Sequence, residues 1–502
     1  MIQHKEKALK WLKGSPKRFL IGGQWVEGSG LKHFDVIDPS TEQVLGSLPE
    51  ANSEIVRQAA QAARDAFKSK ASGSWSTKTR RERADALKAI GRLIREHADE
   101  LAAIETLANG KTFKEARIDD LTESADVFDY YAGWTDKFYG ESVPVDPPFM
   151  NYTVHEPVGV VGLIVPWNFP LLLGCWKLAP ALAMGNTVVM KPASNTSHSM
   201  IRLFEIIHDA GILPHGVLNI VYGDGEPGSA VSSSPLIDKV SFTGSTVVGK
   251  KILAGSSASN LKSVTLELGG KSPNIIFGDA GNLDAVVDRC FTAMFCHKGE
   301  KCSEPTRFIV HSSIYNKFAA KLVALAEAYK VGDPFAEDTQ QGAQANRQHF
   351  EKILGYIEKG KKEGAKLLTG GTRVTSVNGG KGFFVRPTIF GDVKNSMAIA
   401  QEEIFGPVLC LIKFETEEEA VAIANDTQYG LAAGFYSSDA SRCQRVARQL
   451  DAGMIFINHY GCYDFASPFG GFKQSGWGKE MAIHSLSAYT KTKSIWMKYY
   501  LS

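Results

Sequence analysis

Two kinds of hydrophobic spacing alternate along the chain and predict two kinds of element. The segment NSEIVRQAAQAARDAF (52–67) places Ile55, Ala59 and Phe67 at helical spacing behind a capping Asn52 or Ser53, and a second helix is expected over 80–107. From residue 158, short runs rich in Val and Ile alternate with helical segments that begin near residues 171, 198 and 247. Such alternation predicts a parallel sheet buried on both faces. The runs are GVVGLIV (159–165), NTVVMK (186–191), VLNIVYG (217–223), KVSFTG (239–244) and SVTLELGG (263–270).

The alternation begins again after residue 270 and predicts a second α/β unit. Its strands are NIIF (274–277), RFIVHS (307–312), FFVRPTIF (383–390), PVLCLIKF (407–414) and GMIFIN (453–458), with helices over 283–298 and 313–330. The paired glycines and the proline of ELGGKSP (267–273) break both patterns and indicate a hinge. The expected fold class is therefore α/β with two parallel-sheet domains, and a site between them is typical of such proteins.

Two further segments do not fit either unit. Residues 136–157 are rich in proline and interrupt the first domain, while KTKSIWMKYY (491–500) alternates like an exposed strand. An arm that reaches a neighbouring subunit is the expected structure, in a homodimer or a homotetramer.

Composition narrows the class of partner. A chain of 502 residues is too long for one compact core, and a net charge of +2 gives no electrostatic reason to expect nucleic acid. The longest apolar region, 158–175, is interrupted by Pro166, Asn168 and Pro170, so a continuous membrane helix is not expected. The basic segment 1–19 lacks the apolar stretch of a signal peptide and is interpreted as a solvated helix. A small molecule is the expected partner, with no nucleic acid and no membrane.

The seven cysteines form no recognisable framework. Their number is odd, they are widely spaced and they include no C-x-x-C pair, so neither disulfides nor a thiolate metal site is expected. Cys290, Cys296 and Cys302 recur every six residues, but each such step rotates about 240° around a helix, so they share no face. Reduced thiols in the cytoplasm fit this pattern best. Local spacing alone does not single out Cys302 in GEKCSEPTR (299–307).

Two glycine-containing turns are candidates for binding a phosphate. GDGEPG (223–228) satisfies G-x-G-x-x-G after a strand, but no acidic residue stands near the end of the next strand, so a tight structural turn and a pyrophosphate loop both stay open. In SFTGSTVVGK (241–250), Gly244 and Ser245 end a strand and open a helix, where free amides and the helix dipole favour a phosphate. The second turn is the stronger candidate.

The chain resembles the NAD(P)-dependent aldehyde dehydrogenase superfamily in motifs that follow the family's order across nearly its whole length. The motifs are VPWNFP (165–170), WKLAPALAMGNTVVMKPA (176–193), FTGST (242–246), LELGGKSPNIIF (266–277), GEKC (299–302), EEIFGPV (402–408) and SPFGGFKQSGWGKE (467–480). The resemblance implies two Rossmann-like parallel-sheet domains plus a small β oligomerisation arm. The expected ranges are 1–135 with 158–268 for NAD(P) binding, 269–478 for the catalytic domain, and 136–157 with 479–502 for the arm.

The resemblance also implies a chemical role for five residues. Cys302 would attack the aldehyde carbonyl, and the oxyanion would be held by the Asn168 amide and the Cys302 backbone N–H. Hydride transfer to the nicotinamide would leave a thioester, which water activated by Glu267 would hydrolyse. Lys177 and Glu480 match residues that position water and relay protons. Since relatives that transfer the acyl group to coenzyme A typically lack this glutamate, a free carboxylic acid is the expected product.

The cofactor is expected to be NADP, NAD or both. By resemblance, Gly244 and Ser245 approach the pyrophosphate, Glu403 binds the nicotinamide-side ribose, and Phe405 lies beside the nicotinamide. Ser194 stands where many NAD-preferring relatives carry a glutamate, and a serine beside Lys191 can accept a 2′-phosphate. The full cofactor set is Ile164, Val165, Pro166, Trp167, Lys191, Ser194, Gly223, Gly244, Ser245, Leu268, Glu403 and Phe405.

The positions that correspond to the family's aldehyde tunnel are largely aromatic. They are Phe169, Leu173, Trp176, Phe295, Lys301, Ser303, Tyr460, Cys462 and Tyr463. This wall favours a medium or large apolar or aromatic aldehyde, with an aminoaldehyde or betaine-aldehyde substrate as the alternative, since aromatic rings also hold cations. The chain departs from the common G-Q-x-C pattern at Glu300, which places an extra carboxylate near the nucleophile.

Two other functions compete with a dehydrogenase. A binding or structural protein could keep the fold without turnover, but it would not need Cys302, Glu267 and Asn168 together. A cysteine hydrolase would need His297 as its base, in contact with Cys302. Lys301 is adjacent to Cys302, but consecutive side chains in an extended segment point apart, so it is not expected to activate the thiol.

Overall fold

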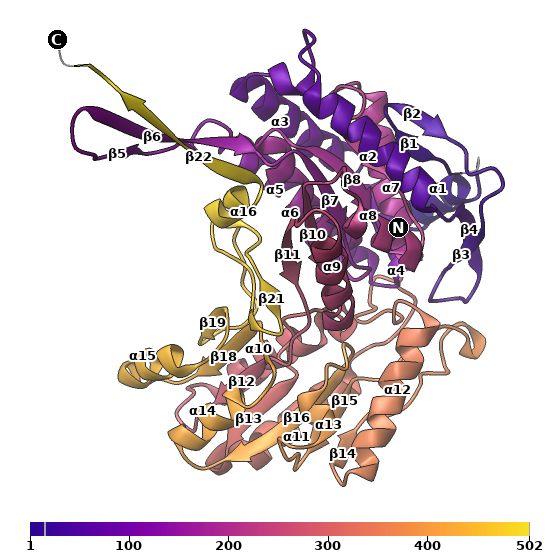
Figure 1. Ribbon diagram of the computed structural model, residues 1–502. Coiled ribbons are helices and arrows are strands. Elements are labelled where there is room, and N and C mark those ends of the chain that lie inside the picture. The colour runs from indigo at the N-terminus through magenta and orange to yellow at the C-terminus, as the bar shows by residue number, and fades with distance from the viewer. Residues whose placement is uncertain (15–16, 501–502) are drawn as a thin grey trace.

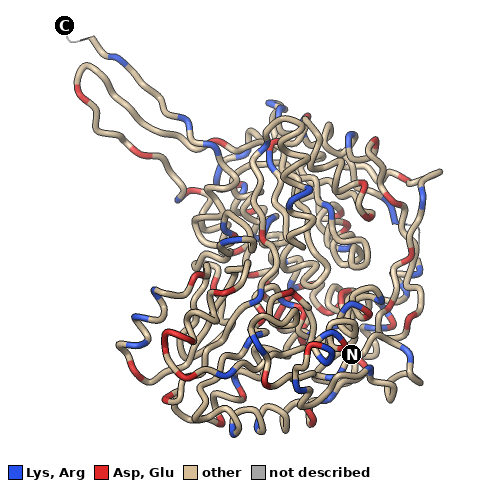
Figure 2. Tube along the Cα trace, turned by 60° about the horizontal axis from the view of Figure 1, so that its bottom comes forward, with Lys and Arg blue, Asp and Glu red and all other residues tan. Residues whose placement is uncertain are grey.

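The computed structural model describes residues 1–14 and 17–500 and has two lobes, each built on one large sheet, with an arm that projects from the first lobe (Figure 1). Lysine, arginine, aspartate and glutamate are interspersed over both lobes (Figure 2). Among the described residues, no helix combines the length and the apolar character needed to cross a bilayer. The α/β fold class agrees with the sequence prediction.

The first sheet has eight strands in the order β2-β1-β9-β8-β7-β10-β11-β21. The five strands from β9 to β11 are parallel, and the edges are antiparallel. The chain runs outward from β7 to β9 and then returns to start β10 on the other side of β7, so the strand order reverses between β7 and β10. A ligand crevice is expected at such a reversal. The strands are β1 (Phe19–Ile21), β2 (Gln24–Val26), β7 (Val160–Ile164), β8 (Thr187–Lys191), β9 (Leu218–Ile220), β10 (Lys239–Thr243), β11 (Ser263–Glu267) and β21 (Gly476–Trp477).

Helices cover this sheet, and their starts follow the predictions closely. The expected cap at Asn52 is present, because its side chain accepts a hydrogen bond from the Ile55 amide. The single helix predicted over 80–107 is wrong, since the helix breaks at His97, where φ is −104° and ψ is 12°. The helices are α1 (Ile2–Leu12), α2 (Ser53–Lys68), α3 (Arg80–Glu96), α4 (Ala98–Asn109), α5 (Leu121–Ala132), α6 (Pro170–Ala183), α7 (Ser197–Asp209), α8 (Gly225–Ser233) and α9 (Thr246–Ala258). A small hairpin of β3 (His33–Ile37) and β4 (Val44–Pro49) lies beside them.

The second sheet has seven strands in the order β14-β15-β16-β13-β12-β18-β19, all parallel except β14. Neighbouring positions of one strand enter different cores: Ile275 packs with Ile309, while Ile276 packs with Phe308. Both faces are therefore buried, as predicted. The strands are β12 (Pro273–Ile276), β13 (Arg307–His311), β14 (Lys366–Thr369), β15 (Thr388–Gly391), β16 (Val408–Phe414), β18 (Ala432–Tyr436) and β19 (Met454–Ile457). The covering helices are α10 (Leu283–Phe295), α11 (Ser312–Ala328), α12 (Arg347–Lys362), α13 (Ala398–Gln401), α14 (Glu417–Asn425) and α15 (Ala440–Gln449).

Two expectations in this lobe are corrected. The strand predicted over 383–390 begins only at Thr388, directly after Pro387, which has no amide hydrogen for a ladder. The helix predicted over 283–298 ends at Phe295, because the next residues turn into left-handed conformations. The short strands β17 (Tyr429–Gly430) and β20 (Phe472–Lys473) pair with each other near the junction of the lobes.

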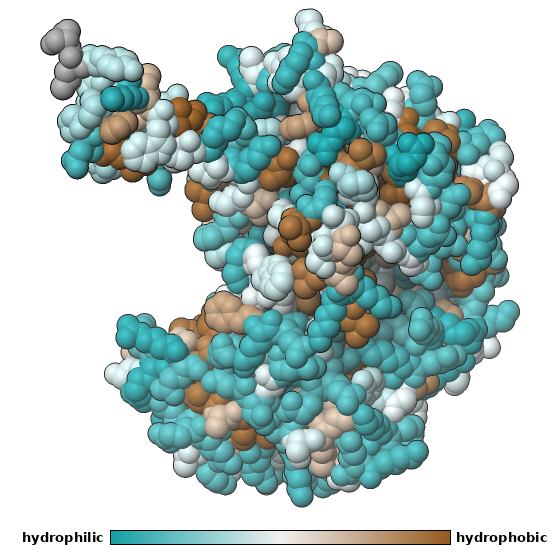
Figure 3. All heavy atoms as spheres, in the orientation of Figure 1, coloured by the Kyte–Doolittle hydropathy of each residue, from teal (hydrophilic) through white to brown (hydrophobic). Residues whose placement is uncertain are grey.

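The arm is an antiparallel sheet in the order β22-β6-β5, where β22 is Thr490–Lys498, β6 is Phe149–Pro157 and β5 is Ser142–Val143. It joins the two segments that the sequence set apart, with α16 (Ala482–Ala488) leading into β22. Residues 501–502 of the predicted arm range lie outside the described residues. The arm stands away from the body, with apolar side chains among the polar ones on its surface (Figure 3).

Candidate active site

One cavity of about 520 Å³ lies at the reversal point of the first sheet and brings together residues from both lobes. Its walls come from the turns after β7, β10 and β11, from the Cys302 loop and from the start of α12. The lining residues are Pro166, Trp167, Asn168, Thr243, Gly244, Ser245, Leu268, Gly269, Cys302, Asn346, Gln348, His349, Lys352, Glu403 and Phe405. The sequence had placed nine of these in catalytic or cofactor roles.

Cys302 is half-buried in this cavity, and its thiol is protonated in this state. Burial, together with the carboxylates of Glu267 and Glu403, raises the pKa of Cys302 to about 12, while nearby backbone amides oppose the shift. Lys301 is not among the groups that stabilise the Cys302 thiolate, as the sequence argument anticipated. A thiol of this kind needs a base or a bound cationic group before it becomes a nucleophile.

The side chain of Asn168 is hydrogen-bonded to the loop that carries Cys302. The Asn168 Nδ2 donates a 2.9 Å hydrogen bond to the carbonyl oxygen of Glu300, and Asn109 Nδ2 donates to the carbonyl oxygen of Trp167 at 2.8 Å. The turn after β7 is thus tied both to α4 and to the loop that carries Cys302. An amide NH₂ has two donors, so one hydrogen of Asn168 stays available for a ligand.

Three successive residues before this loop have left-handed backbones. The φ angles of His297, Lys298 and Gly299 are 47°, 65° and 72°, and only the glycine adopts such a value without strain. Lys298 is buried and anchors the turn, since its Nζ lies 2.9 Å from both the carbonyl and the side-chain oxygen of Asn109. The same Nζ lies 2.7 Å from Glu300 Oε2.

Glu300 therefore faces the turn rather than the nucleophile. Its Oε1 accepts a hydrogen bond from the Ala345 amide at 3.1 Å, and its carboxylate pairs with Lys298. Burial raises the pKa of Glu300 and lowers that of Lys298, and the contact between the two opposes both shifts. The Glu300 carboxylate in GEKC therefore stabilises the left-handed turn through its ion pair with Lys298.

Replacing Glu300 by glutamine is expected to lower the free energy of unfolding by about 2–4 kcal/mol, because the buried Lys298 ammonium loses its counter-charge. Thermal or denaturant unfolding measures this. Glu358→Gln is the control, since Glu358 pairs with Lys361 at the exposed surface, where such a pair contributes about 0–1 kcal/mol. Equal losses in the two variants would contradict the bracing role.

Glu267 ends β11 and is buried near a second carboxylate. Burial raises the pKa of Glu267 well above its ordinary value, Glu480 adds to the rise, and Lys177 and Lys479 oppose it. Its Oε2 has no hydrogen-bond partner among the described residues. A Cβ on Gly470 would lie 2.6 Å from Glu267 Oε1, so the carboxylate packs where only a glycine leaves room.

The predicted pair of Lys177 and Glu480 is present in the structure. Lys177 Nζ donates to Glu480 Oε1 and to Ser241 Oγ, and Ser241 Oγ donates to the same carboxylate oxygen at 3.1 Å. All three groups are buried. The structure therefore places a closed hydrogen-bonded cluster near Glu267, although 303 positions separate its charged partners along the chain.

Five predicted cofactor residues do not line this cavity. Ile164 and Val165 are buried at the end of β7. Lys191 is buried at the end of β8, where its pKa falls to about 8 through burial, opposed by Asp224 and Glu50. Ser194 opens a short turn just after it, at Ser194–Thr196. The last of the five is Gly223, which follows β9 with φ of 142°.

Four of the nine predicted substrate residues lie together, namely Trp176, Ser303, Tyr460 and Tyr463. Trp176 packs edge-on against Phe469, which in turn packs against Tyr463, with ring centroids 5.3 and 5.6 Å apart. The hydroxyls of Tyr463 and Tyr460 bind Ser303, at its Oγ (2.6 Å) and its carbonyl oxygen (2.8 Å). This is an aromatic wall next to the nucleophile.

The remaining substrate candidates are more scattered. Leu173 is buried, Cys462 is exposed, and Phe169 packs on His297 at 4.7 Å. Phe295 is fully buried and packs against Phe291 in the second lobe, which is the environment of a core residue. The substrate roles of this group stay predictions.

His297 does not have the contacts of a hydrolase base. Its ring packs against Phe169, and its Nε2 lies 3.9 Å from Asp119. Burial and three nearby lysines lower its pKa far below the ordinary value, so it stays neutral. No hydrogen bond joins it to Cys302 within the described ranges, and the hydrolase alternative gains no support.

Sequence reasoning missed several residues of the site. Asn346 caps α12 by accepting from the His349 amide, and His349, Gln348 and Lys352 of the same helix line the cavity. The signal was available, because Asn346 opens a segment with helical spacing. Phe469 was missed as a wall residue, although it lies within the motif 467–480.

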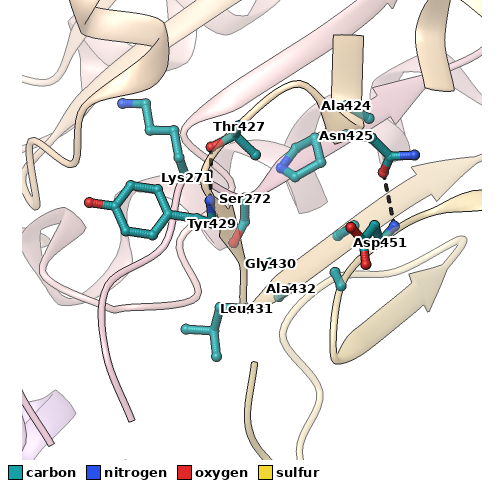
Figure 4. Close-up of a pocket in the computed structure, with 13 residues that line it drawn as sticks. Lys271, Ser272, Ala424, Asn425, Thr427, Tyr429, Gly430, Leu431, Ala432 and Asp451 are labelled. Carbon is teal, nitrogen blue, oxygen red and sulfur yellow. Dashed lines mark hydrogen bonds between the residues drawn. The ribbon is translucent and has the colours of Figure 1, made fainter. Parts of the chain in front are cut away.

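A much smaller pocket lies at the junction of the lobes, lined by Lys271, Asn425, Tyr429 and Asp451 among others (Figure 4). Its volume of about 10 Å³ corresponds to roughly one water molecule. Burial lowers the pKa of Lys271 to about 8. No predicted catalytic, cofactor or substrate residue lines it, so the larger cavity is the candidate active site.

Comparison with known proteins identifies the family of this chain. The family model described as the aldehyde dehydrogenase family matches residues 25–495. An aldehyde dehydrogenase of Emericella nidulans is 45% identical over 481 residues, which are 96% of this chain and 95% of that protein.

Solved structures agree as well. The crystal structure of an indole-3-acetaldehyde dehydrogenase in complex with NAD⁺ is 39% identical, with a TM-score of 0.94 and 99% of each chain covered. The structure of a gamma-glutamyl-gamma-aminobutyraldehyde dehydrogenase from Burkholderia cenocepacia is 41% identical, with the same TM-score and coverage. The expectation of NAD or NADP as cofactor agrees with the NAD⁺ in the first of these. The chain belongs to the aldehyde dehydrogenase family and is an oxidoreductase that acts on aldehydes.

Proposed function

We propose that this enzyme oxidises an aldehyde to the free carboxylic acid through a covalent intermediate on Cys302, with NAD or NADP as the hydride acceptor. The observation that carries the proposal is the cavity itself. A thiol, an amide donor and the residues expected to hold the cofactor line one space at the reversal point of the first sheet.

The first half of the reaction forms a thioester. Cys302 Sγ loses its proton to solvent and attacks the aldehyde carbon as a thiolate. The Asn168 amide and the Cys302 backbone N–H stabilise the oxyanion of the thiohemiacetal. NAD(P), when bound, supplies the acceptor for the hydride that leaves the thiohemiacetal carbon.

The second half releases the acid. Glu267 takes a proton from water, which then attacks the thioester carbonyl and expels the Cys302 thiolate. The hydrogen-bonded group of Lys177, Ser241 and Glu480 lies near Glu267 and would take up that proton. The unpartnered Oε2 of Glu267 is the atom available to accept it.

The cavity fits a dinucleotide. Gly244 and Ser245 stand at the N-terminus of α9, where backbone amides favour a phosphate. Glu403 Oε1 accepts a 2.8 Å hydrogen bond from the Gly270 amide, which leaves its other oxygen for a ribose hydroxyl. Phe405 lies edge-on to Trp167 with ring centroids 5.3 Å apart, and both rings line the space.

Lys191 and Ser194 support the use of NADP. Both lie at the carboxyl end of β8, next to the strands that frame the cavity, and neither residue brings a carboxylate to that end. A 2′-phosphate would meet the Lys191 amine and the Ser194 hydroxyl there.

Replacing Ser194 by glutamate is expected to lower kcat/KM with NADP at least about tenfold, since a carboxylate repels the 2′-phosphate, and to leave the value with NAD nearly unchanged. Initial rates with both cofactors measure this. Ser194→Gln is the matched control, because it has the same size without the charge. A wild-type kcat/KM with NADP about a hundredfold below that with NAD would contradict the proposal.

The wall of Trp176, Phe469 and Tyr463 supports an apolar or aromatic aldehyde as substrate. The alternative, an aminoaldehyde or betaine aldehyde, would bring a cation near the Lys301 ammonium, which is unfavourable. Initial rates over phenylacetaldehyde, hexanal, 4-aminobutyraldehyde and betaine aldehyde, with NAD and with NADP, test the choice. Higher kcat/KM for 4-aminobutyraldehyde and betaine aldehyde than for phenylacetaldehyde and hexanal would favour the cationic substrate class instead.

The arm supports a homo-oligomer. Large apolar side chains of β6 and β22 are exposed on it, including Phe149, Met150, Trp496 and Met497. Burial of such a surface against a second copy removes apolar area from water. A homodimer or homotetramer in the cytoplasm is the proposed state, and light scattering of the purified protein measures its mass.

A further inference from the structure

Lys301 and Cys296 form a contact that the proposed reaction does not use. Lys301 Nζ lies 2.9 Å from Cys296 Sγ, so an amine and a thiol face each other directly beside the active-site loop. The Lys301 side chain is only 15% exposed, and it also pairs with Glu304, whose Oε2 lies 3.2 Å from Nζ. A thiol, an amine and a carboxylate therefore meet at one point.

The local fold holds this contact in place. Cys296 directly follows α10, and the left-handed residues 297–299 reverse the chain, so that Lys301 returns over Cys296 five positions later. Glu300 and Lys298 brace that reversal. The contact is thus a consequence of the buried framework and not of two mobile surface side chains.

No other cysteine has such a partner among residues 1–14 and 17–500. Cys290 accepts a hydrogen bond from Asn274, while the sulfurs of Cys410 and Cys443 contact backbone carbonyls. All seven cysteines are free thiols. Cys296 is half-buried, which leaves it accessible to a small oxidant.

We infer that Cys296 and Lys301 are an oxidation-sensitive pair that closes to a sulfur–nitrogen bond, a sulfenamide, in the presence of hydrogen peroxide. Thiols oxidised to sulfenic acids condense with nearby nitrogen nucleophiles in this way. The inference is independent of the substrate and of the cofactor preference proposed above.

The chemistry balances in two steps. The Cys296 thiolate attacks one peroxide oxygen, the O–O bond breaks, sulfur is oxidised to the sulfenic acid, and the released hydroxide takes up a proton as water. The Lys301 amine then attacks that sulfur, the S–N bond forms, the S–O bond breaks and a second water leaves. One thiol, one amine and one peroxide give one sulfenamide and two waters.

Glu304 supplies the base that the second step needs. Lys301 must lose a proton before its nitrogen can attack, and the adjacent Glu304 carboxylate, whose Oε2 lies 3.2 Å from Nζ, is positioned to accept it. Burial lowers the pKa of Lys301, but Cys296 and Glu304 outweigh it and hold that pKa well above its usual value, so alkaline pH is expected to favour this step. Burial also raises the pKa of Cys296 to about 11, while the Lys301 ammonium opposes the rise, so excess peroxide is expected to be necessary.

The sulfenamide bond would restrict the position of Cys302, the neighbouring nucleophile. Lys301 directly precedes Cys302, so a covalent link from its side chain to the end of α10 restricts the loop that positions the thiol. The link would also remove the ammonium that now faces Glu304.

Tryptic mass spectrometry of the peroxide-treated full-length protein tests the inference, since trypsin cleaves after Lys298, Lys301 and Arg307. The expected product joins peptide 290–298 to peptide 299–307, uncleaved at Lys301 and lighter than their sum by two hydrogen atoms. Fragment ions place the bond on Cys296, and dithiothreitol releases it.

Variants separate this bond from alternatives. Cys296→Ser and Lys301→Arg are each expected to abolish the linked peptide, while Cys290→Ser is the matched control that keeps it. A disulfide between Cys296 and Cys302 would instead join 290–298 to 302–307 with cleavage after Lys301 retained, and would overturn the inference. Oxidation of Cys296 with a free Lys301, a linked product that retains an oxygen atom, or no change at Cys296 would overturn it as well.

Discussion

Replacing Cys302 by serine is expected to lower the rate of NAD(P)H formation from an aldehyde at least about a thousandfold, because a serine hydroxyl is a far weaker nucleophile than a thiolate. The loss should appear in kcat, since the cavity that binds the cofactor is otherwise intact. Absorbance of NAD(P)H measures the rate, and fluorescence titration with NAD(P)H shows that binding is retained.

The matched control is Cys296→Ser, which changes the nearest cysteine in the sequence without touching the cavity lining. It should keep a rate within a few-fold of the wild type under reducing conditions. A Cys302→Ser variant that turns over at the wild-type rate would show that the reaction has no covalent step on this residue.

The relation of sequence to fold is clearest at the strands. Runs rich in Val and Ile predicted β7, β8, β10 and β16 to within two residues, since strands buried on both faces are continuous apolar segments. The break at His97 was not predictable in this way, because the residues on both sides keep helical spacing and only packing decides where the helix bends.

The catalytic residues of the candidate active site could not be predicted from local sequence patterns. Local patterns did not distinguish Cys302 from the other cysteines; the resemblance to a family did. The structure adds what neither could supply, namely the contacts. Lys298 has a left-handed backbone although it is not a glycine, and what holds it there is its pairing with Glu300 and Asn109. Long-range partners of this kind leave no periodic signal in the sequence.

The two residues that the sequence left without a role now have neighbours. Glu300 faces Lys298, and Lys301 faces Cys296 and Glu304. The sequence offered Glu300 only as an influence on Cys302, and offered Lys301 as such an influence or as a residue of the aldehyde tunnel, because both directly precede Cys302. The left-handed turn directs their side chains elsewhere, which is why adjacency along the chain was a poor guide to contact.

Replacing Glu267 by glutamine is expected to slow steady-state turnover by about a hundredfold to ten-thousandfold, because the thioester loses the base that activates water. The first turnover should survive, so rapid mixing should show a burst of NAD(P)H close to one equivalent of enzyme followed by a slow phase. Hydroxylamine, which attacks a thioester without a protein base, should accelerate that slow phase. Absence of the burst, with single-turnover and steady-state rates equally reduced, would place Glu267 in the acylation step instead.

The pH dependence of turnover tests the role of Glu267 as a base independently. Burial and the nearby Glu480 raise the pKa of Glu267, so its carboxyl is protonated at low pH and gains its negative charge only as the pH rises. A base must be ionised to accept a proton, and the steady-state turnover of the wild type, which includes hydrolysis of the thioester, is therefore expected to accelerate with increasing pH. Glutamine does not titrate, so in Glu267→Gln that acceleration should vanish while the slow phase persists. The same rise in both proteins would assign the titration to a group other than Glu267.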